Sequence, residues 1–168
     1  MARGQLDQAM ALHKEGERIC KQLGNLDGLQ RSLGNQAIIL KARSQLDQAM
    51  ALHKEQERIC KKLGDVESLQ ICLGNQALIL KARGQLDHAM ALLKEQERIC
   101  RQLGSPSGLA ASLANQANIQ AQRRQFREAV ALAEQALETA QSHGLEALAQ
   151  QIEPLLARIR SQAAGRPQ

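Results

Sequence analysis

The sequence predicts an all-α protein in which antiparallel helix pairs stack as an α-solenoid. Hydrophobic residues make up 43% of the 168-residue chain but aromatic residues only 1%, so a core must consist of Leu, Ile, Ala and Met, which favour helices over strands. A 40-residue unit also repeats, because residues 2–41 and 42–81 are identical at 30 of 40 positions. Helix pairs of this length cannot close a core alone, and stacking them buries one continuously.

Each unit contains two helical patterns. In residues 45–64 the apolar side chains recur at three- and four-residue spacing, and Gly64 follows as a helix-ending glycine. Residues 67–82 carry the second pattern. The third unit, 82–121, keeps both patterns, whereas the unit from 122 onward is richer in Gln, Arg and Ala. We therefore expect the last unit to be a polar cap on the array.

The distribution of charge argues against a nucleic-acid partner, and the shortness of the apolar runs argues against a membrane span. The net charge of +5 comes from 22 basic and 17 acidic residues that are interspersed along the chain, so no basic stripe forms. Phe126 is the single aromatic residue, which leaves no platform for stacking bases. Neither a signal peptide nor a run near the ~20 apolar residues of a membrane span is present. The expectation is a cytoplasmic protein.

No catalytic, metal or cofactor site is predicted. Cys20, Cys60 and Cys100 share one repeat position, and stacked helices about 8–10 Å apart hold such thiols too far apart for a disulfide. His13 and His53 stand where the third unit has leucine, which indicates a packing position. His53 and Cys60 lie about 10.5 Å apart along a helix axis, too far to share a metal. No phosphate-binding glycine motif occurs.

Residues 72–99, CLGNQALILKARGQLDHAMALLKEQERI, resemble the tetratricopeptide repeat (TPR). The likeness is to the longer variety of about 40 residues found in kinesin light chains, LGN-type polarity adaptors and bacterial signalling ATPases. The family's small and large positions fall on Ala77, Leu80, Gly84, Ala89 and Leu93. This chain departs from the pattern where a leucine is usual, because it has Gln36, Gln76 and Gln116 there.

The resemblance implies a right-handed TPR superhelix with a defined frame. A TPR begins with its helix A, so residues 5–23 would be a leading helix B. Three A–B pairs would follow at 28–63, 67–103 and 107–142, and a capping helix at 145–162, with Pro154 a place where it could kink or break.

The resemblance also implies a peptide-binding groove lined by the A helices. Asparagine suits such a groove, because its amide offers a donor and an acceptor as a peptide bond does. The basic side chains among the groove positions would favour an acidic segment or a carboxylate, and Gly34 and Gly74 would admit the ligand closely. The candidate residues are Arg31, Asn35, Ile38, Lys41, Asn75, Leu78, Lys81, Asn115 and Asn118.

Other interpretations stay open at this point. The asparagines could instead bond neighbouring A helices, and the two glycines could merely permit close packing. We expect Gln36, Gln76 and Gln116 to turn inward and bond a neighbouring helix, because buried amides need partners. The predicted function is a non-enzymatic module that binds a protein or peptide. Alternatives are a scaffold that forms homo-oligomers through its exposed end helix, and the repeat arm of a larger signalling ATPase.

Overall fold

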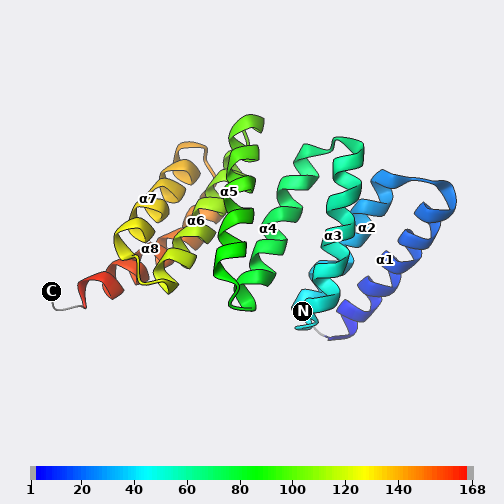
Figure 1. Cartoon of the computed structure of the whole chain (residues 1–168), viewed down its shortest axis with the longest axis horizontal. Helices are drawn as coiled ribbons and strands as arrows, with labels where there is room; N and C mark the ends of the chain where they lie inside the picture. The colour runs from blue at the N-terminus through cyan, green and yellow to red at the C-terminus, as the bar shows by residue number, and fades with distance from the viewer. Residues whose placement is uncertain (1–2, 166–168) are drawn as a thin grey trace. The chain divides into compact units, whose positions relative to one another are not determined.

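The computed structural model describes residues 3–165, and this part of the chain folds into eight α-helices with no strand (Figure 1). Short turns join successive helices. The helices are α1 (Arg3–Leu23), α2 (Leu26–Ala42), α3 (Leu46–Leu63), α4 (Val66–Ala82), α5 (Leu86–Leu103), α6 (Pro106–Gln122), α7 (Phe126–Ser142) and α8 (Glu146–Ala164). The predicted all-α class is confirmed. None of these helices is long and apolar enough to cross a membrane.

The turns between helices follow the glycine pattern of the sequence. Gly64 ends α3 with φ of 68°, and the N–H of Asp65 donates to the carbonyl of Cys60 at 3.0 Å, which is a Schellman motif. The predicted helix-ending role of Gly64 is confirmed. Gly84 also has a positive φ, but Ser44 and Arg124 adopt the same left-handed conformation in the equivalent turns of their units. Those two turns carry a backbone strain of about 1 kcal/mol that a glycine avoids.

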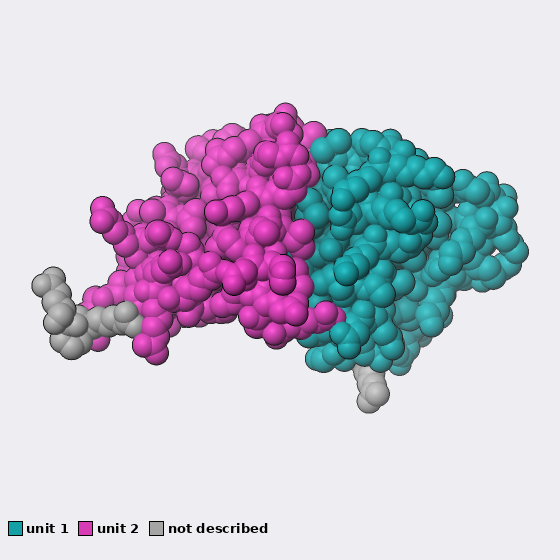
Figure 2. Space-filling model, in the orientation of Figure 1, with its two compact units in different colours: residues 1–79 teal, residues 80–168 magenta. Residues whose placement is uncertain are grey.

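The chain divides into two compact units, residues 1–79 and 80–168 (Figure 2). In unit 1, α2 packs between α1 and α3. Leu29, Leu33 and Ile59 form a buried apolar cluster between α2 and α3, and Ala37 and Ala49 are fully buried. The buried positions of α2 and of α3 recur at three- and four-residue spacing along each helix, which is why the two helices bury one face against each other.

In unit 2, α6 packs against α5, α7 and α8 around two apolar clusters. Both are rich in alanine, which allows the helices to approach closely. On α8, Glu153 and Arg160 are exposed at positions where α2 has the buried Leu33 and Leu40. This side of α8 is therefore polar at the two positions. This helix also continues through Pro154 without a break.

At the other end of the chain, α1 exposes apolar side chains that are covered in its repeat counterpart. Leu12 is 74% and Ile19 is 42% exposed, whereas Ile59, the equivalent of Ile19 in α3, is 2% exposed. The reason is that α2 covers this side of α3, and α1 has no such preceding helix within residues 3–165. Cys20 is consequently only half-buried, although Cys60 and Cys100 are buried.

Candidate functional site

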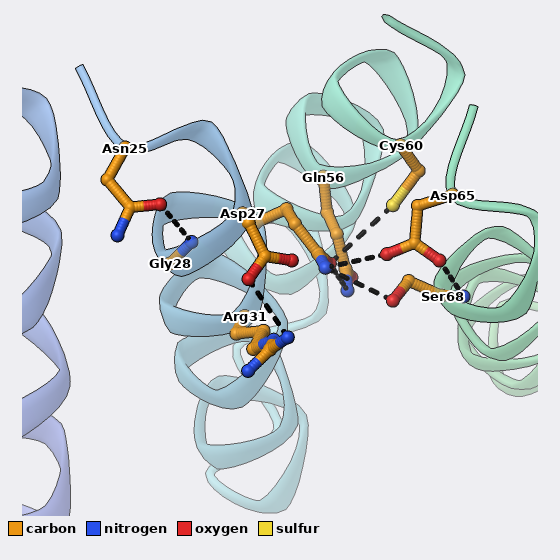
Figure 3. A network of polar contacts seen from close by, with 9 residues as sticks. Asn25, Asp27, Gly28, Arg31, Gln56, Cys60, Asp65 and Ser68 are labelled. Carbon is orange, nitrogen blue, oxygen red and sulfur yellow. Dashed lines mark hydrogen bonds and ion pairs between the residues drawn. The ribbon is translucent and has the colours of Figure 1, made fainter. Parts of the chain in front are cut away.

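A directed chain of hydrogen bonds runs through the interior of unit 1, and Figure 3 shows its part from Asp65 and Ser68 to Gln56. Gln30 donates from Nε2 to Asp65 Oδ2 and to Ser68 Oγ, both at 3.1 Å. Its Oε1 accepts from Gln56 Nε2 at 3.3 Å, and Gln56 Oε1 lies 3.0 Å from His53 Nδ1. A carboxylate only accepts, so Asp65 fixes the orientation of Gln30, then of Gln56, and finally requires that His53 Nδ1 carries the proton.

The position of His53 follows from this chain. The ring is fully buried, and its Nε2, left as a lone-pair acceptor, has no partner among the described residues. Burial lowers the pKa of His53, the Gln56 hydrogen bond raises it to a smaller extent, and the positive charge of Lys41 lowers it further. The ring is therefore neutral near pH 7. The prediction that His53 occupies a packing position is confirmed.

An open cavity of about 280 Å³ lies over this chain, between α2 and α4. The buried amides of Gln30 and Gln56 and the half-buried Ser68 form its polar floor. The full lining is Gln30, Arg31, Gly34, Asn35, Ile38, Gln56, Ser68, Ile71 and Asn75. The structure thus brings four of the predicted groove residues to one cavity: Arg31, Asn35, Ile38 and Asn75.

Each Asn-Gln-Ala triplet divides its two amides between surface and interior. Gln36, Gln76 and Gln116 are each 3% exposed, and each donates at 2.7 Å to a glutamate of the preceding helix, namely Glu17, Glu57 and Glu97. The inward orientation predicted for the glutamines is confirmed. By contrast, the Asn35 and Asn75 side chains reach the surface and make no hydrogen bond to another described residue. Helix-to-helix bonding by these asparagines, the alternative reading, is therefore not observed.

Each of the three predicted basic residues is either engaged with another residue or half-buried. Arg31 forms an ion pair with Asp27 at 2.9 Å. Lys41 is half-buried and lies outside the cavity lining, and burial lowers its pKa. Lys81 belongs to unit 2 and already has an interaction partner.

The other predicted residues lie outside the cavity. Leu78 is half-buried on α4 and does not contribute to the lining. Asn115 and Asn118 are half-buried on α6 of unit 2. Asn118 Oδ1 accepts a hydrogen bond from Arg158 of α8 at 3.4 Å, so this amide is partly engaged within its own unit.

Gly34 is explained by packing. A Cβ at this position would lie 2.7 Å from Gln56 Nε2 and 3.0 Å from its Cδ, so the glycine makes room for the glutamine. In unit 2 the equivalent pair is Ala114 and Ala136, which pack in one apolar cluster. Sequence reasoning missed Gln30, Gln56 and Ser68 as lining residues. One signal in the sequence could have indicated this contact: the equivalents of Gly34 and Gln56 in unit 2 are both alanine.

We predict that Gly34→Ala lowers the free energy of unfolding by about 1–2 kcal/mol, because overpacking against Gln56 outweighs the better helix propensity of alanine. Urea denaturation followed by circular dichroism measures the change. Gly4→Ala is the matched control, since a Cβ there would meet nothing within 4 Å, and no loss is expected. An unchanged or higher stability of Gly34→Ala would contradict the packing explanation.

The described side chains provide no evident catalytic or metal chemistry. No group of three or more His, Cys, Asp and Glu residues is placed to hold a metal ion in the described part of the chain. Burial raises the pKa of Cys60 to about 11 and that of Cys72 to about 12. Both thiols are thus protonated at neutral pH and are poor nucleophiles.

Comparisons with known proteins identify the type of repeat. Residues 112–145 match the family model of the tetratricopeptide repeat. The crystal structure of BtubC (BKLC) from P. vanneervenii is similar to this chain with a TM-score of 0.68 and 19% identity, over 94% of this chain and 74% of that one. A P. anserina protein of the kinesin light chain type, with nearly identical TPR-like repeats, matches with a TM-score of 0.67 and 21% identity, over 97% and 90% of the two chains. No curated protein sequence matches.

The family model and the solved structures match different lengths of this chain. The family model falls on part of α6, all of α7 and the turn that follows. The structural matches extend over nearly the whole chain. The predicted α-solenoid of TPR type is confirmed.

Proposed function

Because this chain is a repeat protein of the TPR type, we propose that it is a non-enzymatic interaction module that binds an extended peptide segment over the cavity of unit 1. The observation that carries this proposal is the pair of asparagines. The amides of Asn35 and Asn75 line one cavity and have no partner among residues 3–165, although the glutamine next to each is bonded inside. Free amides at a cavity rim suit the alternating N–H and C=O groups of a peptide backbone.

Apolar side chains beside the cavity add contact area for the peptide. Ile38 is 47% and Ile71 is 54% exposed, and both line the cavity. An aliphatic side chain of a bound peptide would cover these two residues, and the burial of apolar surface would contribute to affinity. Since Arg31 is already paired with Asp27, the proposal does not require an acidic partner. Free and mainly buried cysteines fit a cytoplasmic location.

The test is selection from a displayed library of random peptides with the full chain, followed by fluorescence anisotropy of a labelled winning peptide. Replacing both Asn35 and Asn75 with alanine is expected to weaken binding about tenfold or more, because each lost hydrogen bond costs about 1 kcal/mol. Gln22→Ala with Gln141→Ala removes two exposed amides elsewhere and should leave affinity unchanged. The proposal fails if no peptide is enriched, or if the asparagine variant keeps full affinity and an intact helical spectrum.

A second candidate function is self-association through α1. The exposed Leu12, Ile19 and Leu23 form an apolar stripe at seven- and four-residue spacing on the side of α1 that lacks a covering helix. Two copies could cover this stripe mutually as a symmetric dimer. Sedimentation velocity over a range of concentrations tests this idea. Leu12→Gln should abolish any dimer that forms in this way, and a monomer at every concentration would exclude it.

A further inference from the structure

We infer that the cavity floor in unit 1 selects a neutral carboxamide, the side chain of glutamine or asparagine, from the bound peptide. This inference rests on the proposed peptide-binding function and adds the chemistry of one peptide position to it. Its basis is the hydrogen-bond directionality of the floor, together with the charges that surround it.

The floor offers two donors that have no acceptor among the described residues. Gln30 uses its amide N–H groups on Asp65 and Ser68, and its Oε1 accepts from Gln56 and from the Cys60 thiol, the latter at 3.6 Å. Gln56 Oε1 faces His53. The two donors are the second N–H of Gln56 and the O–H of Ser68, while Gln56 Oε1 and Ser68 Oγ each keep one lone pair. A group that enters the cavity must therefore carry an acceptor to satisfy these donors.

The surrounding charges favour a neutral acceptor over a carboxylate. Asp65 is bonded to the floor residue Gln30, so its negative charge lies directly behind the floor. Arg31 at the rim forms an exposed ion pair with Asp27, and no other basic side chain lines the cavity. A carboxylate would face Asp65 without an unpaired cation and would pay for its desolvation.

A carboxamide meets both conditions. Its carbonyl oxygen can accept from Gln56 and Ser68 at the floor, and its amide hydrogens can be donated to the side-chain oxygens of Asn35 and Asn75, which also line the cavity. An aliphatic side chain would leave the polar floor without partners, which is costly in a half-enclosed site.

The polar floor is not needed to pack helices in this arrangement. Unit 2 repeats the packing of α2, α3 and α4 in α6, α7 and α8, where the equivalents of the polar residues are apolar. Six residues of unit 1 have apolar equivalents in unit 2: Ala133 for His53, Ala136 for Gln56, Ala110 for Gln30, Ala140 for Cys60, Leu145 for Asp65 and Leu148 for Ser68. The hydrogen-bonded chain of unit 1 thus serves the cavity above it, because alanines and leucines suffice for stacking.

The test uses propionamide and sodium propionate as probes, titrated into the isotopically labelled full chain and followed by NMR at constant ionic strength. Propionamide should shift the side-chain NH₂ signals of Gln56, Asn35 and Asn75 saturably, and propionate should bind several-fold more weakly. Ser68→Ala should weaken propionamide by about two- to tenfold, since one hydrogen bond is lost. Ser68→Thr keeps the hydroxyl and should restore binding, and Ser161→Ala on the exposed side of α8 is the control.

Equal or tighter binding of propionate overturns the inference, and so does the lack of a saturable shift with propionamide. An affinity for propionamide that is unchanged by Ser68→Ala also overturns the inference. These failures can be told apart from failure of the proposed function. A display-selected peptide that needs Asn35 and Asn75, but gains nothing from a Gln or Asn residue, keeps the peptide-binding function and removes only the carboxamide preference.

Discussion

Replacing Gln76 with leucine is expected to lower the free energy of unfolding by about 2 kcal/mol, whereas leucine at both Gln76 and Glu57 should restore most of it. Gln76 is 3% exposed and donates to Glu57 Oε2 at 2.7 Å. Removing one partner leaves an oxygen of the half-buried Glu57 carboxylate without its donor, while replacing both partners by apolar groups removes the penalty. Urea denaturation of the two single variants and the double variant gives the coupling free energy.

The pKa of Glu57 supports a strong dependence on Gln76. Burial alone would raise the pKa of this carboxyl, but hydrogen bonds from Lys61 and Gln76, together with the positive charges of Lys61 and Lys54, outweigh burial and hold the pKa below its usual value. The charged form is thus stabilised by two donors in the folded state. Loss of the Gln76 donor leaves the desolvation cost in place and takes away part of the compensation.

The equivalent positions in unit 2 already carry two leucines. In unit 2 the equivalents of Glu57 and Gln76 are Leu137 and Leu156, which pack in the same apolar cluster. As a control, Glu55→Ala removes an exposed ion pair with Arg58, and it should change stability by no more than about 0.5 kcal/mol. If the double variant loses the sum of the two single losses, the polar pair and the leucine pair are not interchangeable.

The inward glutamines show what the sequence could predict. Their orientation followed from the position next to the repeat's small alanine, because a residue one step around a helix from an exposed asparagine must face another helix. The fold, the helix ends at Gly64 and the packing role of His53 were predicted in the same way. All of these predictions depend on the spacing of residues along a helix, and that spacing recurs in three near-identical units.

The cavity floor could not be predicted from spacing alone. Gln30 and Gln56 are polar residues on amphipathic helices, and such residues usually lie on a solvated face. Their burial depends on a mutual contact across two helices and on the space that Gly34 leaves. Only the paired change to alanine in the later unit records this contact in the sequence. The same limit applies to Arg31, whose pairing with Asp27 is one of several that a charged helix permits.

Acidification is expected to destabilise the protein in two separate windows, and His53→Leu should remove the first. His53 is buried, neutral and has a lowered pKa, so the unfolded chain, with an ordinary His pKa near 6.5, binds a proton more readily than the folded chain. The stability contributed by the neutral ring is full above about pH 6.5 and falls as pH drops from there toward the lowered pKa, by at most about 1.4 kcal/mol per pH unit. The carboxyl of Glu57, also with a lowered pKa, loses its contribution only at lower pH, below about 4.5.

Leucine fits the His53 position because its repeat equivalent, Leu93, is 1% exposed. Near pH 7.5 the variant should be within about 1 kcal/mol of the wild type, since the lost hydrogen bond to Gln56 is offset by added apolar burial. At pH 5 it should be clearly the more stable protein. Urea denaturation at both pH values measures the difference, and His88→Leu, which replaces an exposed histidine, should keep the wild-type pH dependence. If the free energy of unfolding of His53→Leu falls between pH 7.5 and 5 as steeply as that of the wild type, the buried ring is not the group that titrates.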